Sequence, residues 1–165
     1  MRALQLVVAT AASCALLACG GHKTPRLIWN ATASAPIGFY AVVQASSLHR
    51  GDLVLAVPPP SVQHFAAQRD YLPIGVPLVK HIGALGGDDV CGKDHVISIN
   101  GHIAVRRLTS DHLHRPLPGW TGCHALSSSE LLLLNEDVAT SLDGRYFGPT
   151  ATAAVIGKLV PLWTH

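Results

Sequence analysis

The sequence predicts a mainly β, barrel-like domain that follows an apolar N-terminal segment. Three observations predict it: short β-branched runs recur along residues 39–163, Gly and Pro separate them, and residues 3–20 carry no charge. A length of 165 residues suits one domain with a real core, and 48% apolar against 13% charged residues argues against disorder. The net charge of +2 is too small to favour a nucleic-acid partner.

The first expected element is a signal or membrane-anchor segment over residues 1–20. The stretch ALQLVVATAASCALLACG follows Arg2 and is just long enough for a helix across a bilayer. A short N-terminal tail favours export of the remaining domain, residues 27–165. The alternatives are a core helix that ends at Gly20 and a lipoprotein cleavage site before Cys19, so cleavage, retention or lipidation of the segment stays open.

The first half of the domain predicts strands with one helical interruption. FYAVVQA (39–45) and DLVLAV (52–57) are strands joined by the turn-rich SSLHRG. A Pro run then makes a loop, and SVQHFAAQRDY (61–71) predicts a two-turn helix capped by Ser61. VPLVKHIGAL (76–85) predicts a longer, buried strand.

The second half predicts a hairpin and two closing strands. HVISINGHIAVRR (95–107) alternates on both sides of Asn100-Gly101, a dipeptide that suits a tight hairpin turn. LTSDHLHRPLPGWTG (108–122) predicts a surface loop, and ELLLLN (130–135) and AAVIGKLVPLW (153–163) close the sheet.

Cysteine usage agrees with export. Cys91 and Cys123 are the only pair outside the apolar segment. In an oxidising compartment they would bridge a loop of about 30 residues and contribute ~3 kcal/mol. Two separate buried thiols are the alternative. The spacing matches no zinc ribbon, and no metal motif, phosphate loop or dinucleotide fingerprint occurs. We therefore expect no cofactor and no metal.

Two residues suggest nucleophilic catalysis. Ser34 lies among small residues before Pro36 and Gly38, where a peptide backbone can approach closely. Lys80 lies in the predicted buried strand, and desolvation lowers the pKa of a lysine so that its neutral amine can accept a hydroxyl proton. A lowering by ~3 units would cost ~4 kcal/mol. Taken singly, each residue is more often structural.

Four stretches occur in the order of a known family. SAPIGFY begins at Ser34, HRGDLVLAV carries Gly51-Asp52 at a turn, PLVKHIGALGGDDV contains Lys80, and SLDGRYFGP spans 141–149. Together they resemble the signal peptidase family of serine proteases with a Ser/Lys dyad, closest to the TraF-type conjugative transfer enzymes. The resemblance covers the chain after residue 27 and implies a signal-peptidase or LexA-like catalytic domain.

The resemblance implies a role for each matched residue. Ser34 would be the nucleophile and Lys80 the general base, with Ser141 orienting the amine. Thr32 would join the Ser34 N–H in an oxyanion hole. Asp143, paired with Arg145, would support the dyad or act more directly.

The resemblance also implies a membrane-borne, pilin-like precursor as substrate, cut and joined head to tail or simply hydrolysed, by a periplasmic enzyme at the inner membrane. The chain departs from the family in having Lys80-His81 instead of Lys-Arg and Gly86-Gly87 where a Pro is usual. The large accessory domain of housekeeping signal peptidases does not fit this length, which favours a specialised processing enzyme. A general signal peptidase that removes leader peptides is the alternative.

Histidines supply the rival interpretations. His112, His114 and His124 gather near Cys123 in a polar region. They permit a non-enzymatic, exported metal-binding protein, and a Ser-His-Asp triad with Ser34 is conceivable. Solvated loop histidines are the plainest interpretation of this group.

Overall fold

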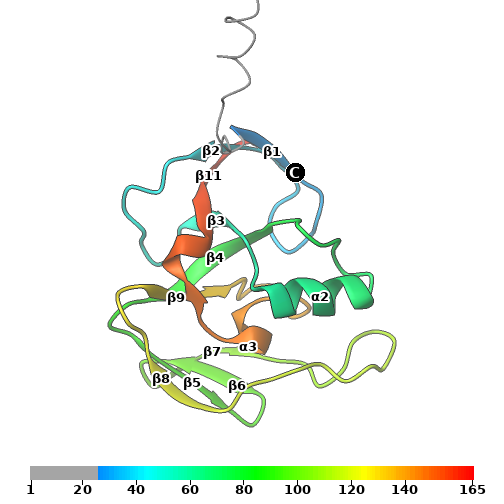
Figure 1. The fold of residues 1–165 in the computed structure, drawn as a ribbon, viewed down its shortest axis with the longest axis vertical. Helices are drawn as coiled ribbons and strands as arrows, with labels where there is room; N and C mark the ends of the chain where they lie inside the picture. Colours follow the sequence, from blue (N-terminus) through cyan, green and yellow to red (C-terminus); the bar gives the residue numbers. More distant parts are fainter. Residues whose placement is uncertain (1–25) are drawn as a thin grey trace, which may run out of the picture.

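The computed structural model describes residues 26–165, which form a mainly β fold of two sheets with two short helices (Figure 1). This confirms the predicted fold class. The strands are β1 (Leu27–Asn30), β2 (Gly38–Val43), β3 (Leu53–Ala56), β4 (Leu78–Leu85), β5 (Asp89–Lys93), β6 (Val96–Ile99), β7 (His102–Arg106), β8 (Gly122–Ala125), β9 (Glu130–Leu134), β10 (Thr150–Ala151) and β11 (Val155–Thr164). The helices are α2 (Pro60–Gln68) and α3 (Gly144–Phe147), with a 3₁₀ turn, η1, at Thr152–Ala154.

The larger sheet has seven antiparallel strands in the order β1-β2-β11-β3-β4-β9-β10. Its inner strand β4 is paired on both sides, with Lys80 opposite Val54 of β3 and Ile82 opposite Leu133 of β9. All but two residues of β4 are buried. A strand enclosed in this way keeps water from both of its faces, and it carries the predicted lysine.

The smaller sheet has the order β7-β6-β5-β8 and lies at the opposite end of the molecule from β1 and β2 (Figure 1). The predicted hairpin is confirmed as β6 and β7, with Asn100 and Gly101 at φ of 50° and 78° in the turn. Cys91 and Cys123 face each other across β5 and β8 and form the predicted disulfide. The cross-link therefore ties β8 to its neighbour within the smaller sheet.

The core divides into three apolar clusters. One joins the two sheets and includes Val90, Ile97 and Leu132, and a second lies behind the Ser34 turn around Tyr40 and Leu55. The third packs β3, β4 and β9 together through residues such as Val54, Ile82 and Leu133.

Gly38 is required where β2 meets the end of β11. A Cβ at this position would lie 2.0 Å from the backbone oxygen of Trp163. The glycine after the Ser34 turn thus permits the two strands to approach closely.

Some local predictions were wrong. Ser61 does not cap α2: the helix begins at Pro60, its N-cap position is Pro59, and no side chain caps it. Proline has a φ that suits the first helical position, so the helix starts one residue earlier than a serine cap would allow. Gly122, expected at the end of a surface loop, begins β8, whose four residues are all exposed and carry no apolar alternation.

Neither helix between residues 26 and 165 is long and apolar enough to cross a membrane. The predicted signal or anchor segment, residues 1–20, lies outside the described residues, as do Cys14 and Cys19.

Candidate active site

The Ser34 turn is held from within by a buried asparagine that sequence reasoning missed. Asn30, 5% exposed at the end of β1, donates through Nδ2 to the carbonyl oxygens of Thr32, Ala35 and Pro36, each at 3.0 Å. Its Oδ1 accepts from the backbone N–H of Thr32 at 3.2 Å. One side chain thus fixes the path of the backbone on both sides of Ser34.

The hydroxyls of Thr32 and Ser34 are 3.1 Å apart. Thr32 Oγ1 donates to Asn30 Oδ1 at 2.9 Å. Because that bond uses the only hydroxyl proton of Thr32, Ser34 must be the donor in the contact between the two hydroxyls. The backbone N–H of Ser34 makes no hydrogen bond to another described residue.

Lys80 is buried in β4, as its apolar neighbours predicted. It is 3% exposed, and its Nζ donates to Ser141 Oγ at 2.7 Å. Burial lowers the pKa of Lys80 from 10.5 to about 8, against the charge of Asp143, which raises it, and together with that of Arg145, which lowers it. A substantial neutral fraction near pH 8 gives the amine the capacity to accept a proton.

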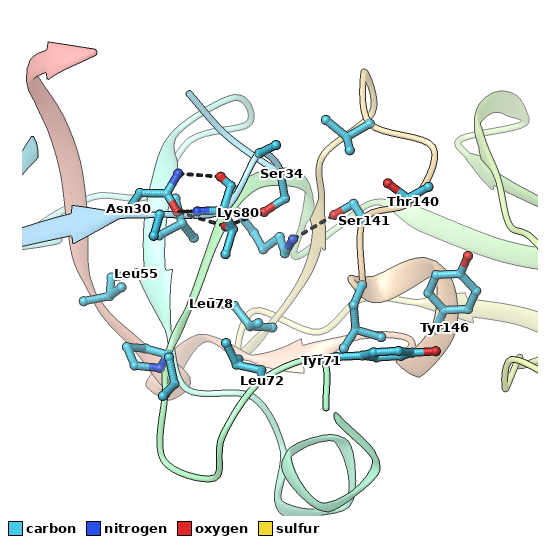
Figure 2. Close-up of a pocket in the computed structure, with 18 of the residues that line it drawn as sticks. Asn30, Ser34, Leu55, Tyr71, Leu72, Leu78, Lys80, Thr140, Ser141 and Tyr146 are labelled. Carbon is cyan, nitrogen blue, oxygen red and sulfur yellow. Dashed lines mark hydrogen bonds between the residues drawn. The ribbon is translucent and has the colours of Figure 1, made fainter. Parts of the chain in front are cut away.

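Ser34, Lys80 and Ser141 line one cavity of about 720 Å³, into which Figure 2 shows their side chains pointing. A dashed line there marks the bond from Lys80 to Ser141. Among the described residues, no hydrogen bond joins Ser34 Oγ to Lys80 Nζ, since Ser34 is turned towards Thr32. The rest of the wall is largely apolar and includes Ile28, Leu55, Leu72, Val76, Leu78, Leu108, Leu117 and Val138.

Asp143 and Arg145 form a buried ion pair beneath Ser141. Their exposed fractions are 0% and 1%. The guanidinium donates through Nε to Oδ1 at 2.8 Å and through Nη2 to Oδ2 at 3.0 Å, a two-pronged contact. Asp143 also accepts from the backbone N–H of Arg145 at the start of α3. Asp143 makes no hydrogen bond to Ser34 or Lys80, and its charge acts on Lys80 through space.

Asn135 is the second residue that sequence reasoning missed. Its Nδ2 donates to the carbonyl oxygens of Ser34 and Val79, and its Oδ1 accepts from the backbone N–H of His81 at 3.0 Å. Its backbone N–H donates to Asp143 Oδ2 at 3.0 Å. The side chain is 3% exposed and joins the Ser34 turn, β4 and the ion pair.

Asp111 holds together part of the wall of the larger cavity through hydrogen bonds. The carboxylate accepts from Tyr71 Oη at 2.5 Å and from Arg115 Nε at 2.7 Å. Tyr71 follows α2 and Asp111 belongs to the loop that ends at β8. These contacts connect two loops that the sequence leaves unrelated.

The predicted histidine group does not assemble. His124 contacts Glu130 at 3.1 Å, whereas His112 lines the large cavity. Across residues 26–165, no three His, Cys, Asp or Glu side chains are arranged to hold a metal ion.

Comparison with known proteins adds to this geometry. Residues 1–163 match the family described as signal peptidase, peptidase S26. The plasmid transfer protein TraF of Escherichia coli is 32% identical over 96% of this chain and 93% of its own length. The conjugal transfer protein TraF of Agrobacterium fabrum is 30% identical over 88% of this chain and 84% of its own. The solved structure of a signal peptidase I from Enterococcus faecalis is 20% identical, with 70% of this chain and 98% of that chain covered and a TM-score of 0.41.

Proposed function

Because this chain belongs to the signal peptidase family, peptidase S26, we propose that it is a serine endopeptidase with Ser34 as nucleophile and Lys80 as general base. One observation carries the proposal. Lys80, which is only 3% exposed, lines the same cavity as Ser34, and the turn that bears Ser34 is held in place by hydrogen bonds. A buried amine with a pKa of about 8 and no carboxylate bonded to it is suited to proton transfer.

The first half-reaction uses groups already within the cavity. Ser34 rotates away from Thr32 and donates its proton to the neutral amine of Lys80, which Ser141 holds in place. Ser34 Oγ attacks the scissile carbonyl, and the Ser34 N–H stabilises the oxyanion. Thr32 joins it once its hydroxyl proton leaves Asn30. Lys80 then protonates the departing amine, and an acyl-enzyme remains.

Asp143 acts in this scheme as a positioning residue. Its carboxylate neutralises Arg145, and the pair anchors Asn135, which in turn holds the carbonyl of Ser34. The same carboxylate caps the start of α3, and Arg145 also donates to the carbonyl oxygen of Ala139 in the segment that carries Ser141. The ion pair therefore helps to hold the Ser34 turn and β4 in fixed positions relative to each other.

The substrate we propose is a membrane-borne, pilin-like precursor of a conjugation system. The support is the similarity to relatives named as plasmid and conjugal transfer proteins, together with a cavity whose wall is mainly apolar. An acyl-enzyme on Ser34 can pass to water or to an amine held nearby, because positioning greatly raises effective concentration. We propose that the amine is the precursor's own N-terminus, so that the product is a ring.

An exposed aromatic face supports the proposed location at a membrane. Trp29 of β1, Phe39 of β2 and Trp163 of β11 are 46%, 43% and 55% exposed. Their rings pack against one another, with centroids 4.7 Å apart for Trp29 and Phe39 and 6.1 Å for the two tryptophans. Tryptophan favours the headgroup region of a bilayer. The apolar stretch 3–20 ends only a few residues before β1 in the sequence. If that stretch inserts into a membrane, the aromatic face would lie close to the bilayer surface, and we propose that it contacts the lipid headgroups.

Co-expression with candidate precursors tests the proposal. We expect the wild-type chain to shorten a precursor and to yield a mass one water below that of the trimmed linear chain. Ser34→Ala and Lys80→Ala should leave the precursor uncut although both variants fold, and a chelator should change nothing. Cleavage that survives either substitution would refute the dyad, and a trimmed linear product would refute the cyclisation. Removal of many unrelated leader peptides would favour a general signal peptidase.

A further inference from the structure

A second cavity lies on the other side of the Ser34 turn. It has a volume of about 380 Å³ and is lined by residues 33–37, by His81 and by residues 135–138. Ser34 lines both cavities, whereas Lys80 lines only the larger one. The Ser34 turn therefore borders a cavity on each of its two sides.

His81 stands in this second cavity with its tautomer fixed by Asn135. Asn135 Nδ2 points at two carbonyl oxygens, those of Ser34 and Val79, so its Oδ1 must be the atom that faces His81. His81 Nδ1 is 3.2 Å from that oxygen. Because an amide oxygen only accepts, Nδ1 carries the proton of the neutral ring and Nε2 keeps a free lone pair. The ring is half-buried and follows Lys80 directly in β4.

The rim of this cavity is negatively charged. Glu136 and Asp137 line it and are exposed, and neither makes a hydrogen bond or an ion pair with another described residue. Two carboxylates beside a serine raise the local concentration of a cation. A peptide N-terminus is a cation that can also become a nucleophile after losing a proton.

From this arrangement, and resting on the proposed acyl-enzyme at Ser34, we infer that the second cavity is the acceptor site for a peptide amine and that His81 is the proton acceptor of the second half-reaction. Lys80 serves the first half-reaction from the larger cavity. The two steps thus use adjacent residues of one strand, and alternation along β4 directs them to opposite sides of the nucleophile turn.

The second half-reaction transfers the acyl group from Ser34 to the amine. The ammonium group loses its extra proton to solvent, and the neutral amine attacks the acyl carbon. A C–N bond forms and His81 Nε2 takes one N–H proton. The C–Oγ bond then breaks, its electron pair returns to Ser34, and the imidazolium gives its proton to Ser34 Oγ. An amide and a free serine hydroxyl result.

An ester probe separates the two half-reactions. With a peptide p-nitrophenyl ester, the full chain releases nitrophenol in a burst that reports acylation, and added glycinamide competes with water for the acyl-enzyme. In His81→Ala the burst rate should stay within about twofold of wild type, and the ratio of amide to acid product should fall about 100-fold, the usual size of a general-base contribution. Free imidazole should restore the ratio. His102→Ala, at an exposed position of β7, is the matched control.

Three results would overturn the inference: an unchanged product ratio in His81→Ala, an equal loss of burst and turnover, or a defect that imidazole does not repair. The last two would make His81 a structural residue. Failure of the proposed function looks different, since wild type would then show no burst or Ser34→Ala would keep it. A normal burst with a product ratio indifferent to His81 would remove only the acceptor site.

Discussion

Replacing Lys80 by methionine removes the cost of holding a cation within the sheet. Burial lowers the pKa of Lys80 from 10.5 to about 8. The difference of 10.5 − 8 = 2.5 pH units corresponds, at 1.36 kcal/mol each, to about 3 kcal/mol of unfolding free energy that the protonated form lacks relative to the neutral form. Methionine has a similar unbranched shape and no charge to desolvate.

The pH dependence of the unfolding free energy isolates the cost of burying the Lys80 cation. Below pH 8 both the folded and the unfolded chain bind the proton, so this group contributes no slope. Between pH 8 and 10.5 only the unfolded chain keeps it, and wild-type stability rises with pH. From pH 8 to 9.5 the rise is about 2 kcal/mol at 1.36 kcal/mol per pH unit. The difference in unfolding free energy between Lys80→Met and wild type should therefore decrease by about 2 kcal/mol between pH 7 and 9.5.

Urea unfolding followed by tryptophan fluorescence measures this difference. Lys93→Met, at an exposed position of β5, is the control and should keep a constant offset from wild type over the same range. A constant offset for Lys80→Met as well would refute the reasoning, since it would mean that the buried amine has the same proton affinity in the folded and unfolded chain.

Further predictions concern activity and the supporting contacts. If the neutral amine of Lys80 is the base, kcat/KM for an ester probe should rise with pH through a midpoint near 8, and a flat profile would contradict its role. Asp143→Asn leaves the buried guanidinium of Arg145 without its charge partner, so we expect the unfolding free energy in urea to fall by about 3–5 kcal/mol, with an unchanged midpoint counting against this account. Replacing Cys91 and Cys123 by alanine opens a loop of separation 32 and should cost about 3 kcal/mol of stability while activity per folded molecule is kept, because the bridge lies in the smaller sheet. Loss of activity in the folded double variant would contradict that separation.

The strands with strong apolar patterns were predictable from sequence. β2, β3, β4, β9 and β11 coincide with β-branched or leucine-rich runs, and Asn100-Gly101 marked the hairpin. β8 was missed because the sequence GCHA is exposed and is held by backbone pairing and a disulfide to β5. A strand of this kind has no apolar alternation in its sequence from which it could be predicted.

The site shows a similar division. Ser34 and Lys80 were singled out by their local sequence and by the resemblance to family motifs, and Ser141 by the resemblance alone; all three line one cavity. Asn30 and Asn135 were missed because an asparagine beside a turn is ordinary in sequence. Their importance appears only when carbonyl groups from separate segments converge on one amide, and Asn135 reaches a residue 101 positions away.

Enclosure of Lys80 between β3 and β9 makes its chemistry depend on the tightness of that sheet. A slight parting of these strands that let water reach the amine would return the pKa of Lys80 towards 10.5, and the neutral fraction at pH 8 would fall from about one half to less than about one hundredth. If Lys80 is the proposed base, we expect activity to fall on warming before the domain unfolds.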